Sequence, residues 1–244
     1  IIPTYNRFDS LLNTINSVKN QTYQNLEIIV VNDNSTQKEY YNYDWELNKI
    51  NIIHLDKNSK DIFGYPCVGF VINKGIKKMT GDYFATCDDD DSWLPNKLSI
   101  QLMAMKQTGC KMSSTAGFSG SGIYNPSKKY KLYNTNSNYN HRVLSRYRYR
   151  NRYRNVCNVN KNIWDYNFLK IQNCIIACSV IIHKDIVKKI GNQLEIRMGG
   201  TKINGKVVHI DYEYWLRALK YTNCVNIDKP CVYYDSAHGN GKNY

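Results

Sequence analysis

The stretch Tyr83–Pro95, with the sequence YFATCDDDDSWLP, places four consecutive aspartates, Asp88 to Asp91, directly after a short apolar run. Adjacent carboxylates raise one another's pKa, so four of them stay ionised together only beside a cation. An amphipathic run begins near Leu94, which places the acids on the loop between a strand and a helix. Ligands of open α/β sheets bind outside the carboxyl ends of the strands, so the stretch predicts an α/β fold with a ligand site at this loop.

The residue types of this loop favour a metal site. Mg²⁺ and Mn²⁺ prefer carboxylate oxygens and usually keep water and substrate phosphate as further ligands. A metal–diphosphate site is therefore the first hypothesis, and a solvated turn whose acids cap the next helix is its alternative. A calcium loop of the EF-hand type starting at Asp88 is excluded, because Trp93 and Ser99 stand where that loop requires Gly and Glu.

The composition is that of a folded domain with anionic partners. The chain has 244 residues, of which 42% are hydrophobic and 13% aromatic, and this is too apolar for a disordered protein. A net charge of +13 favours nucleotides, nucleic acid, acidic glycans or an anionic membrane surface as partners. No run of the sequence is as apolar and as long as a membrane span.

The eight cysteines are scattered and form no Cys-x-x-Cys pair. We expect buried free thiols rather than zinc ligands or disulfides, which indicates a reducing compartment. The glycosylation sequon at Asn34 falls in the expected nucleotide pocket, which argues against secretion. The expected location is the cytoplasm, with peripheral contact to a membrane as an open alternative.

Strand and helix patterns alternate over the first 116 residues. Strands are expected at 1–2, 26–31, 50–55 and 83–87, and helices at 11–18, 40–45, 68–79 and 98–109. This alternation predicts βαβ units and a largely parallel sheet. Acidic turns follow the second and the fourth strand, so Asp33 and the four aspartates should share one sheet edge, where a nucleotide would bind. Because the sequence has no glycine-rich phosphate loop, phosphate binding is left to the metal.

Several residues are expected to end or to cap these elements. Asp9 or Ser10 should cap the first helix, and Gly81 should close the helix of 68–79. Later in the chain, residues 174–183 are expected to form a strand, followed by a short helix that ends near Gly191. A mobile loop is expected at 192–206, a helix capped by Asp211 at 211–221, and short strands at 224–234.

Residues 117–162 are polar and lack a sustained period. Arginine is interleaved with tyrosine between Arg142 and Arg154. Such a pattern can stack on bases and pair with phosphates, but it also suits a solvated basic face. We favour a basic rim for an acidic acceptor or a membrane surface over nucleic-acid binding.

Four segments in order resemble the family 2 inverting nucleotide-sugar glycosyltransferases, which have the A-type fold. They are IIPTYNR at 1–7, IIVVNDNS at 28–35, NKGIKKMTGDYF at 73–84 with its acidic continuation, and HIDYEYWLR at 209–217. The resemblance covers the chain except about 117–173. It implies one domain over 1–244 with a Rossmann-like mixed sheet and helices on both faces. Residues 1–116 would bind the nucleotide sugar, and 117–244 would form the acceptor side, with a basic Tyr/Arg-rich insertion at about 117–165.

The resemblance also implies roles for particular residues. Nucleotide-binding residues would be Pro3, Thr4, Tyr5, Asp33, Asp88 and Asp89. Metal ligands for Mn²⁺ or Mg²⁺ would be Asp90, Asp88 and His238. Asp211 would be the catalytic base. The chain departs from the family pattern at Ile210, where an acid is usual, at 69–72, where an arginine is frequent, and at Asn32, which replaces a frequent acid.

The implied reaction is the metal-dependent transfer of a sugar from a UDP-sugar to an acceptor hydroxyl. One carboxylate suffices as the base of a single in-line displacement, and a divalent ion neutralises the leaving diphosphate. The alternatives are a nucleotidyltransferase, which would normally carry a basic glycine-rich loop near the first strand, and a nucleic-acid-binding module built on the Arg/Tyr segment.

Overall fold

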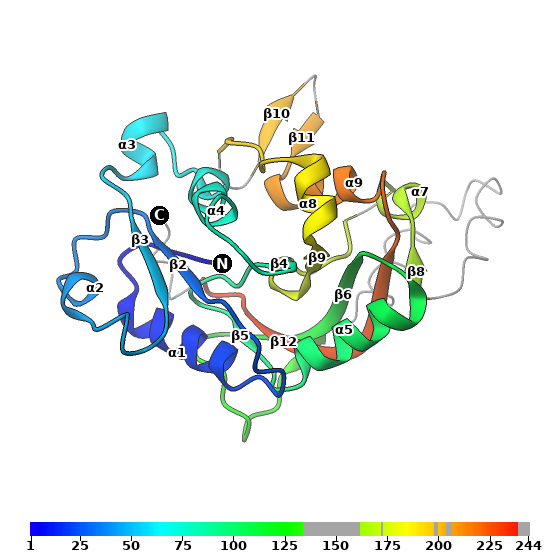
Figure 1. The fold of residues 1–244 in the computed structure, drawn as a ribbon, viewed down its shortest axis with the longest axis horizontal. Helices are drawn as coiled ribbons and strands as arrows, with labels where there is room; N and C mark the ends of the chain where they lie inside the picture. The colour runs from blue at the N-terminus through cyan, green and yellow to red at the C-terminus, as the bar shows by residue number, and fades with distance from the viewer. Residues whose placement is uncertain (134–161, 172, 198–199, 204–205, 239–244) are drawn as a thin grey trace.

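The computed structural model describes residues 1–133, 162–171, 173–197, 200–203 and 206–238. Within these residues, two connected sheets run through a mixed α/β domain (Figure 1). The Arg/Tyr segment of 142–154 lies outside the described residues, so its predicted role stays a prediction.

A parallel three-stranded sheet opens the chain. Its strands are β1 (Ile2–Thr4), β2 (Ile29–Asn32) and β3 (Asn51–His54), in the order β1-β2-β3. The connecting helices are α1 (Phe8–Lys19), α2 (Glu39–Asn42), α3 (Ser59–Phe63) and α4 (Val68–Ile76). The predicted strand and helix alternation is confirmed in this half of the chain.

Helices cover both faces of this sheet because successive strand residues point to opposite sides. Val30 belongs to the cluster that contains Leu11 and Ile15 of α1. Its neighbours Ile29 and Val31 pack with Val71 of α4. The predicted α/β architecture with helices on both faces is therefore confirmed.

The second sheet is mixed rather than largely parallel. Its strand order is β4-β9-β6-β12-β5, with β7 paired to β6 and β8 paired to β12. Only the β6–β12 pair is parallel. The strands are β4 (Tyr83–Ala85), β5 (Ser92–Trp93), β6 (Met112–Gly120), β7 (Lys131–Tyr133), β8 (Ile163–Trp164), β9 (Ile181–His183) and β12 (Cys224–Asp235). The resemblance implied a mixed sheet, and this expectation is confirmed; the parallel pairing predicted from the alternation over 1–116 holds for β1, β2 and β3, whereas β4 pairs antiparallel with β9.

Backbone hydrogen bonds join the two sheets at the first residue. The Ile1 amino group donates to Ala85 O at 2.9 Å, and Cys87 N donates to Ile1 O at 3.2 Å. β4 therefore runs beside β1, and the acidic loop that follows β4 lies at the carboxyl end of β1. The prediction named the strands of 26–31 and 83–87; β1 lies between their counterparts β2 and β4, so the turn after β2 and the acidic loop lie at the same edge.

The remaining elements cover the second sheet. They are α5 (Lys97–Thr108), α7 (Tyr166–Leu169), the 3-10 helix η3 (Ala177–Ser179), α8 (Lys184–Ile190), the antiparallel hairpin β10 (Thr201–Ile203) with β11 (Lys206–Val208), and α9 (Ile210–Ala218). Residues 174–183 were expected to form one strand, but η3 interrupts them, and only the last three pair with β4 and β6. The expected loop of 192–206 contains the hairpin strand β10.

Helix ends differ from the prediction at three places. α1 begins at Phe8, so Asp9 and Ser10 lie inside it and do not cap it. α4 ends at Ile76, well before Gly81. The residue before α9 is His209, which leaves Asp211 in the first turn rather than at the cap. Gly109 ends α5 with a φ of 72°, a left-handed conformation that glycine adopts without strain.

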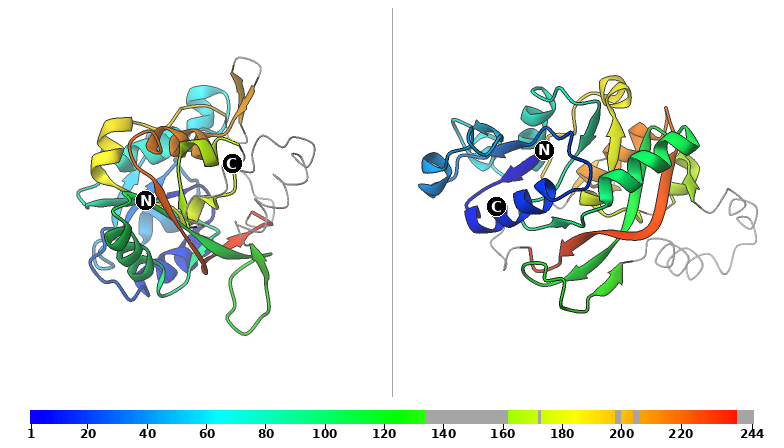
Figure 2. Two further views of the ribbon diagram at one scale, coloured as in Figure 1. Left: turned by 90° about the vertical axis from the view of Figure 1, so that its right-hand side faces the viewer. Right: turned by 60° about the horizontal axis from the view of Figure 1, so that its bottom comes forward.

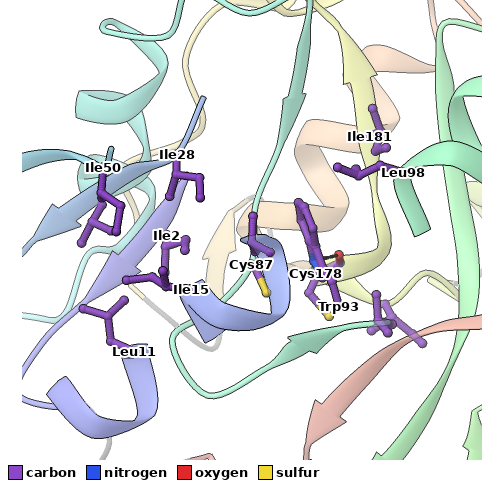
Figure 3. Packing of buried hydrophobic residues seen from close by; sticks show 14 of the residues in the cluster. Ile2, Leu11, Ile15, Ile28, Ile50, Cys87, Trp93, Leu98, Cys178 and Ile181 are labelled. Atoms are coloured by element: carbon purple, nitrogen blue, oxygen red, sulfur yellow. Dashed lines mark hydrogen bonds between the residues drawn. The ribbon is translucent and has the colours of Figure 1, made fainter. Parts of the chain in front are cut away.

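The core joins the two halves of the chain. Trp93 packs with Cys87 and Ile181, and its indole N–H donates to Cys178 O at 3.0 Å (Figure 3). The described cysteines are buried free thiols, as predicted: Cys67, Cys87, Cys110, Cys174, Cys178, Cys224 and Cys231. Among the described residues, no helix combines the length and the apolar character that crossing a membrane requires.

Candidate functional site

A cavity of about 330 Å³ lies where β1 and β4 end. The acidic loop forms one wall and the start of α9 another. Six of the predicted site residues line it together: Pro3, Asp88, Asp89, Asp90, Asp211 and His238. The structure therefore brings the acidic loop and Asp211, which are far apart in the sequence, to one cavity.

Arg7 is a site residue that sequence reasoning missed. Its Nη1 donates to Asp89 Oδ1 at 2.9 Å and to Asp90 Oδ2 at 2.8 Å, and all three side chains are buried. Arg7 directly precedes α1 and reaches the acidic loop from the end of β1. The guanidinium is thus a resident counter-ion for two of the four adjacent carboxylates.

Asp88 has no such partner. Its carboxylate lines the cavity and makes no side-chain hydrogen bond with a described residue. Burial, together with Asp90 and Asp89, raises the pKa of Asp88 to about 7. Burial also raises the pKa of Asp89 to about 7 against the opposing effect of Arg7, and Asp89 Oδ2 has no hydrogen-bond partner among the described residues. Ionising both Asp88 and Asp89 is therefore unfavourable with Arg7 alone, and a cation in the cavity would favour their ionised forms.

Asp91 has a structural part in the loop. Its Oδ1 accepts a hydrogen bond from Asp235 N at 2.9 Å, and its backbone carbonyl accepts one from the Thr14 hydroxyl at 2.7 Å. These bonds fix the acidic loop to α1 and to the end of β12. Two further residues of the cavity wall are Tyr234, near the end of β12, and His238, just after it, whose Oη and Nε2 atoms are 3.2 Å apart.

Asp211 faces the acidic loop from α9. Burial raises its pKa, while the hydrogen bond from Tyr212 N to its Oδ1, at 2.6 Å, acts in the opposite direction. Its charge also contributes to the raised pKa of Asp88, as expected of two carboxyl groups at one cavity. Ile210, the position where the family pattern has an acid, lines the cavity as an apolar side chain.

Asn73 fixes another part of the wall. Its side chain donates to Gln193 O at 3.0 Å and accepts from Gln193 N at 2.8 Å, so a single amide holds the loop after α8 against α4. Gln193 lines the cavity beside Ile72. Neither Gln193 nor its bond to Asn73 has a local signal in the sequence, since 120 residues separate the two partners.

Asp33 lies apart from this cavity. Its side chain is fully buried and accepts hydrogen bonds from Ser59 N at 2.7 Å and from Ser59 Oγ at 2.6 Å, at the start of α3. Burial raises the pKa of Asp33 to about 6.

Thr4 is also buried, with its hydroxyl 2.6 Å from Tyr40 Oη, and neither Thr4 nor Tyr5 belongs to the cavity wall. The nucleoside role of Asp33, Thr4 and Tyr5 stays a prediction.

The donor set at the cavity fits a divalent cation that the substrate helps to coordinate. The described residues contain no group of three His, Cys, Asp or Glu side chains already arranged around a metal position. A Mg²⁺-type site, however, takes one or two carboxylates and completes its shell with substrate phosphate and water. Asp88 and Asp90 supply such a pair, and a cation beside them would favour the ionised form of carboxyl groups whose pKa burial raises.

Replacing Arg7 by Met should destabilise the protein by about 3–5 kcal/mol, because it leaves buried carboxylates without their counter-ion. The measurement is urea-induced unfolding at neutral pH. The matched control is Lys111→Met, which breaks a half-exposed ion pair with Asp185 and should cost under about 1 kcal/mol. Equal stability losses for the two variants would contradict the proposed role of Arg7.

Asp33→Asn should change how stability depends on pH. The folded-state pKa of about 6 exceeds the ordinary 3.8, so the folded protein binds more protons between these values and loses stability as pH rises through them. The asparagine variant lacks this loss; its amide oxygen can still accept from Ser59 N, and its NH2 group can donate to Ser59 Oγ, which reverses the second bond. By pH 7 the variant should gain about 2–3 kcal/mol relative to the wild type. Thermal unfolding from acid to neutral pH tests this, and parallel curves would refute it.

The fold and the site together define an A-type glycosyltransferase domain: a parallel sheet, then a mixed one, with an acidic loop at their shared edge. The chain belongs to glycosyl transferase family 2, whose family model matches residues 1–169.

Curated relatives match less than half of the chain. It is 38% identical over 109 residues to the putative colanic acid biosynthesis glycosyl transferase WcaA of Escherichia coli, covering 43% of this chain and 37% of WcaA. It is 32% identical over 121 residues to the putative teichuronic acid biosynthesis glycosyltransferase TuaG of Bacillus subtilis, covering 47% of this chain and 44% of TuaG. The aligned parts span less than half of these relatives.

Solved structures extend the likeness over the whole chain. S. aureus TarS matches with a TM-score of 0.64 and 16% identity, covering 97% of this chain and 36% of TarS. The structure of TarS 1-349 in complex with UDP-GlcNAc matches with a TM-score of 0.64 and 15% identity, covering 100% of this chain and 60% of that one. At these identities the likeness establishes the fold.

Proposed function

We propose that this chain transfers a sugar from a UDP-sugar to an acceptor hydroxyl, with inversion at the anomeric carbon. The observation that carries the proposal is the single cavity lined by Asp211 on one side and by Asp88 and Asp90 on the other. Family membership supports the reaction class, and the TarS structures solved with UDP and UDP-GlcNAc support the donor class.

Donor binding is assigned to the edge formed by β1, β2 and the acidic loop. Pro3 lines the cavity, while Thr4, Tyr5 and Asp33 lie at the ends of the two strands and would contact the nucleoside. Asp33 can serve this edge in two ways. It would contact the nucleoside directly if it exchanged its bonds to Ser59 for bonds to the ligand, or it would act indirectly by holding α3 in its present place. Arg7 keeps the acidic loop folded beside the diphosphate position.

Asp90 and Asp88 would hold a Mn²⁺ or Mg²⁺ ion, with His238 as a further ligand. A bound ion would act as a Lewis acid that neutralises charge on the leaving diphosphate. The protein's own part is to keep two carboxylates on one wall and to limit their repulsion through Arg7. His238 lines the cavity, so a modest movement of the segment after β12 would bring it to the same ion.

Asp211 would act as the general base. In the proposed step the acceptor oxygen bonds to the anomeric carbon, the bond from that carbon to the diphosphate oxygen breaks, and UDP leaves with the electron pair. The acceptor proton moves to the Asp211 carboxylate. Burial favours the protonated form and so raises the proton affinity of Asp211, which suits a base that takes a proton from a weakly acidic hydroxyl.

A thermal-shift screen of nucleotide sugars tests the donor assignment. A ligand that binds only the folded state raises the melting temperature. UDP-sugars with Mn²⁺ should raise it more than GDP- or dTDP-sugars do, and uridine alone should give a smaller effect. A larger shift with a purine nucleotide sugar would refute the UDP assignment while leaving the reaction class intact.

A further inference from the structure

The positive charge of the chain is concentrated in one segment. Of its 33 Lys and Arg residues, 13 lie within residues 92–164, which contain none of its 20 Asp and Glu residues. The rest of the chain is therefore formally neutral, and the net charge of +13 belongs to this segment. Its best-exposed described part is the hairpin of residues 120–133, which connects β6 and β7.

This hairpin projects from the body of the domain as the loop at the bottom of Figure 1, and it hangs below the domain in the left view of Figure 2. It is nevertheless well anchored. Tyr130 packs on Tyr233 of β12 with ring centroids 4.8 Å apart, and Tyr233 Oη donates to Gly122 O at 2.8 Å. Tyr130 Oη also accepts a hydrogen bond from Asn125 N at 2.8 Å. These contacts fix the hairpin on β12 and so fix the positions of its exposed side chains.

The outer side chains are basic and aliphatic. Lys128, Lys129 and Lys131 are exposed and make no ion pair with any described residue. Ile123 is 61% exposed and Leu132 is 48% exposed on the same hairpin. Exposed aliphatic side chains beside unpaired lysines are the combination that binds the headgroup and acyl boundary of an anionic bilayer.

We propose that the hairpin of residues 120–133 docks this domain on an anionic lipid surface. Charge complementarity supports a bilayer, because no acidic residue of the segment opposes the three lysines. The aliphatic residues distinguish a bilayer from a nucleic acid, since Ile123 and Leu132 lose water-exposed area only by entering an apolar phase. Leu47 is more exposed, at 79%, but Asp44 and Glu46 flank it and would repel the same surface.

The hairpin is also tied to the catalytic cavity. Ser236 N donates to Gly120 O at 2.8 Å, and the residues on either side of Ser236 include two of the cavity wall, Tyr234 in β12 and His238 after it. A docked hairpin would therefore hold the cavity close to the lipid surface, where a lipid-linked acceptor could enter. This consequence rests on the proposed function, whereas the docking itself does not.

Vesicle co-sedimentation tests the docking directly. The wild-type chain should bind phosphatidylcholine vesicles that contain phosphatidylglycerol and should not bind phosphatidylcholine alone. A variant with Lys128, Lys129 and Lys131 each replaced by Gln should bind the anionic vesicles roughly 100-fold more weakly. The variant Ile123→Ser, Leu132→Ser should also weaken binding, and by a factor that added salt changes little.

The matched control removes the same charge elsewhere. Lys57, Lys77 and Lys78 are exposed in the neutral part of the chain, and their joint replacement by Gln should leave vesicle binding within about twofold of the wild type. Equal losses in the two triple variants would overturn the proposal, as would unchanged binding of the hairpin variants. Binding of a single-stranded RNA through the same lysines without vesicle binding would overturn it in favour of a nucleic-acid partner. The thermal unfolding transition of each variant verifies its fold and depends neither on the docking nor on the proposed function.

Discussion

Asp211→Asn should slow sugar transfer at least a hundredfold while leaving the fold and UDP binding unchanged. Loss of a general base typically costs about 10²–10⁴-fold in rate. The structure sharpens this prediction, because Asp211 lies in the first turn of α9 and is not its cap. Asparagine keeps the acceptor for Tyr212 N and removes only a charge near the helix start, worth about 0.3–1 kcal/mol.

Glu213 offers the matched control for Asp211. It lies two residues further along the same helix, but its carboxylate is held by Arg217 at 2.8 and 3.0 Å and does not line the cavity. Glu213→Gln should therefore transfer sugar at close to the wild-type rate. Both variants are compared by UDP release from the best-bound UDP-sugar. If the Asp211 variant stayed near the wild-type rate, the assignment of the base would be wrong.

Asp90→Ala should remove turnover and the effect of divalent ions on donor binding. A Lewis-acid ion supplies several kcal/mol of charge stabilisation, and each 1.4 kcal/mol corresponds to about tenfold in rate, so a loss of at least a hundredfold is expected. The variant should still fold, because Asp89 remains as a partner for Arg7. Rates and UDP affinity are measured with Mn²⁺ and with EDTA.

Asp185→Ala is the control for a lost aspartate at a distance from the cavity. Asp185 is half-exposed, pairs with Lys111, and follows His183, which pairs with Tyr83 at the start of β4, whereas the acidic loop follows the end of that strand. Its removal should leave both the rate and the metal response near the wild-type values. An Asp90 variant that worked normally in EDTA would rule out the proposed cation.

The local patterns of the sequence predict the first half of the chain well. Apolar segments are separated by turn residues there, and the strands are followed by helices that pack on them. Short-range periodicity is therefore sufficient to predict these elements. The second half depends on long-range pairing. β6 and β12 form a parallel pair whose register begins with Cys224 opposite Met112. No local signal in the sequence specifies that register. The apolar run of 174–183 was assigned to one strand because an apolar run alone does not reveal that η3 divides it.

The site shows the same division between local and distant information. Asp88 and Asp90 were predicted from an acidic run that directly follows an apolar strand pattern, whereas Asp211 was predicted from the resemblance to the family; all three line the cavity. Arg7 was missed because its partner Asp89 is 82 residues away. Charge balance could have found it, since buried carboxylates require a cation and Arg7 is the basic residue of the opening segment IIPTYNR. The wall residue Gln193 had no comparable signal.

The central claim is that the acidic loop binds a nucleoside diphosphate together with a divalent cation. Calorimetric titration of the wild-type chain with UDP, once with Mn²⁺ and once with EDTA, tests it most directly. If UDP and Mn²⁺ bind cooperatively at Asp88 and Asp90, Mn²⁺ should tighten UDP binding at least tenfold, which corresponds to about 1.4 kcal/mol. The same dissociation constant under both conditions would contradict the claim.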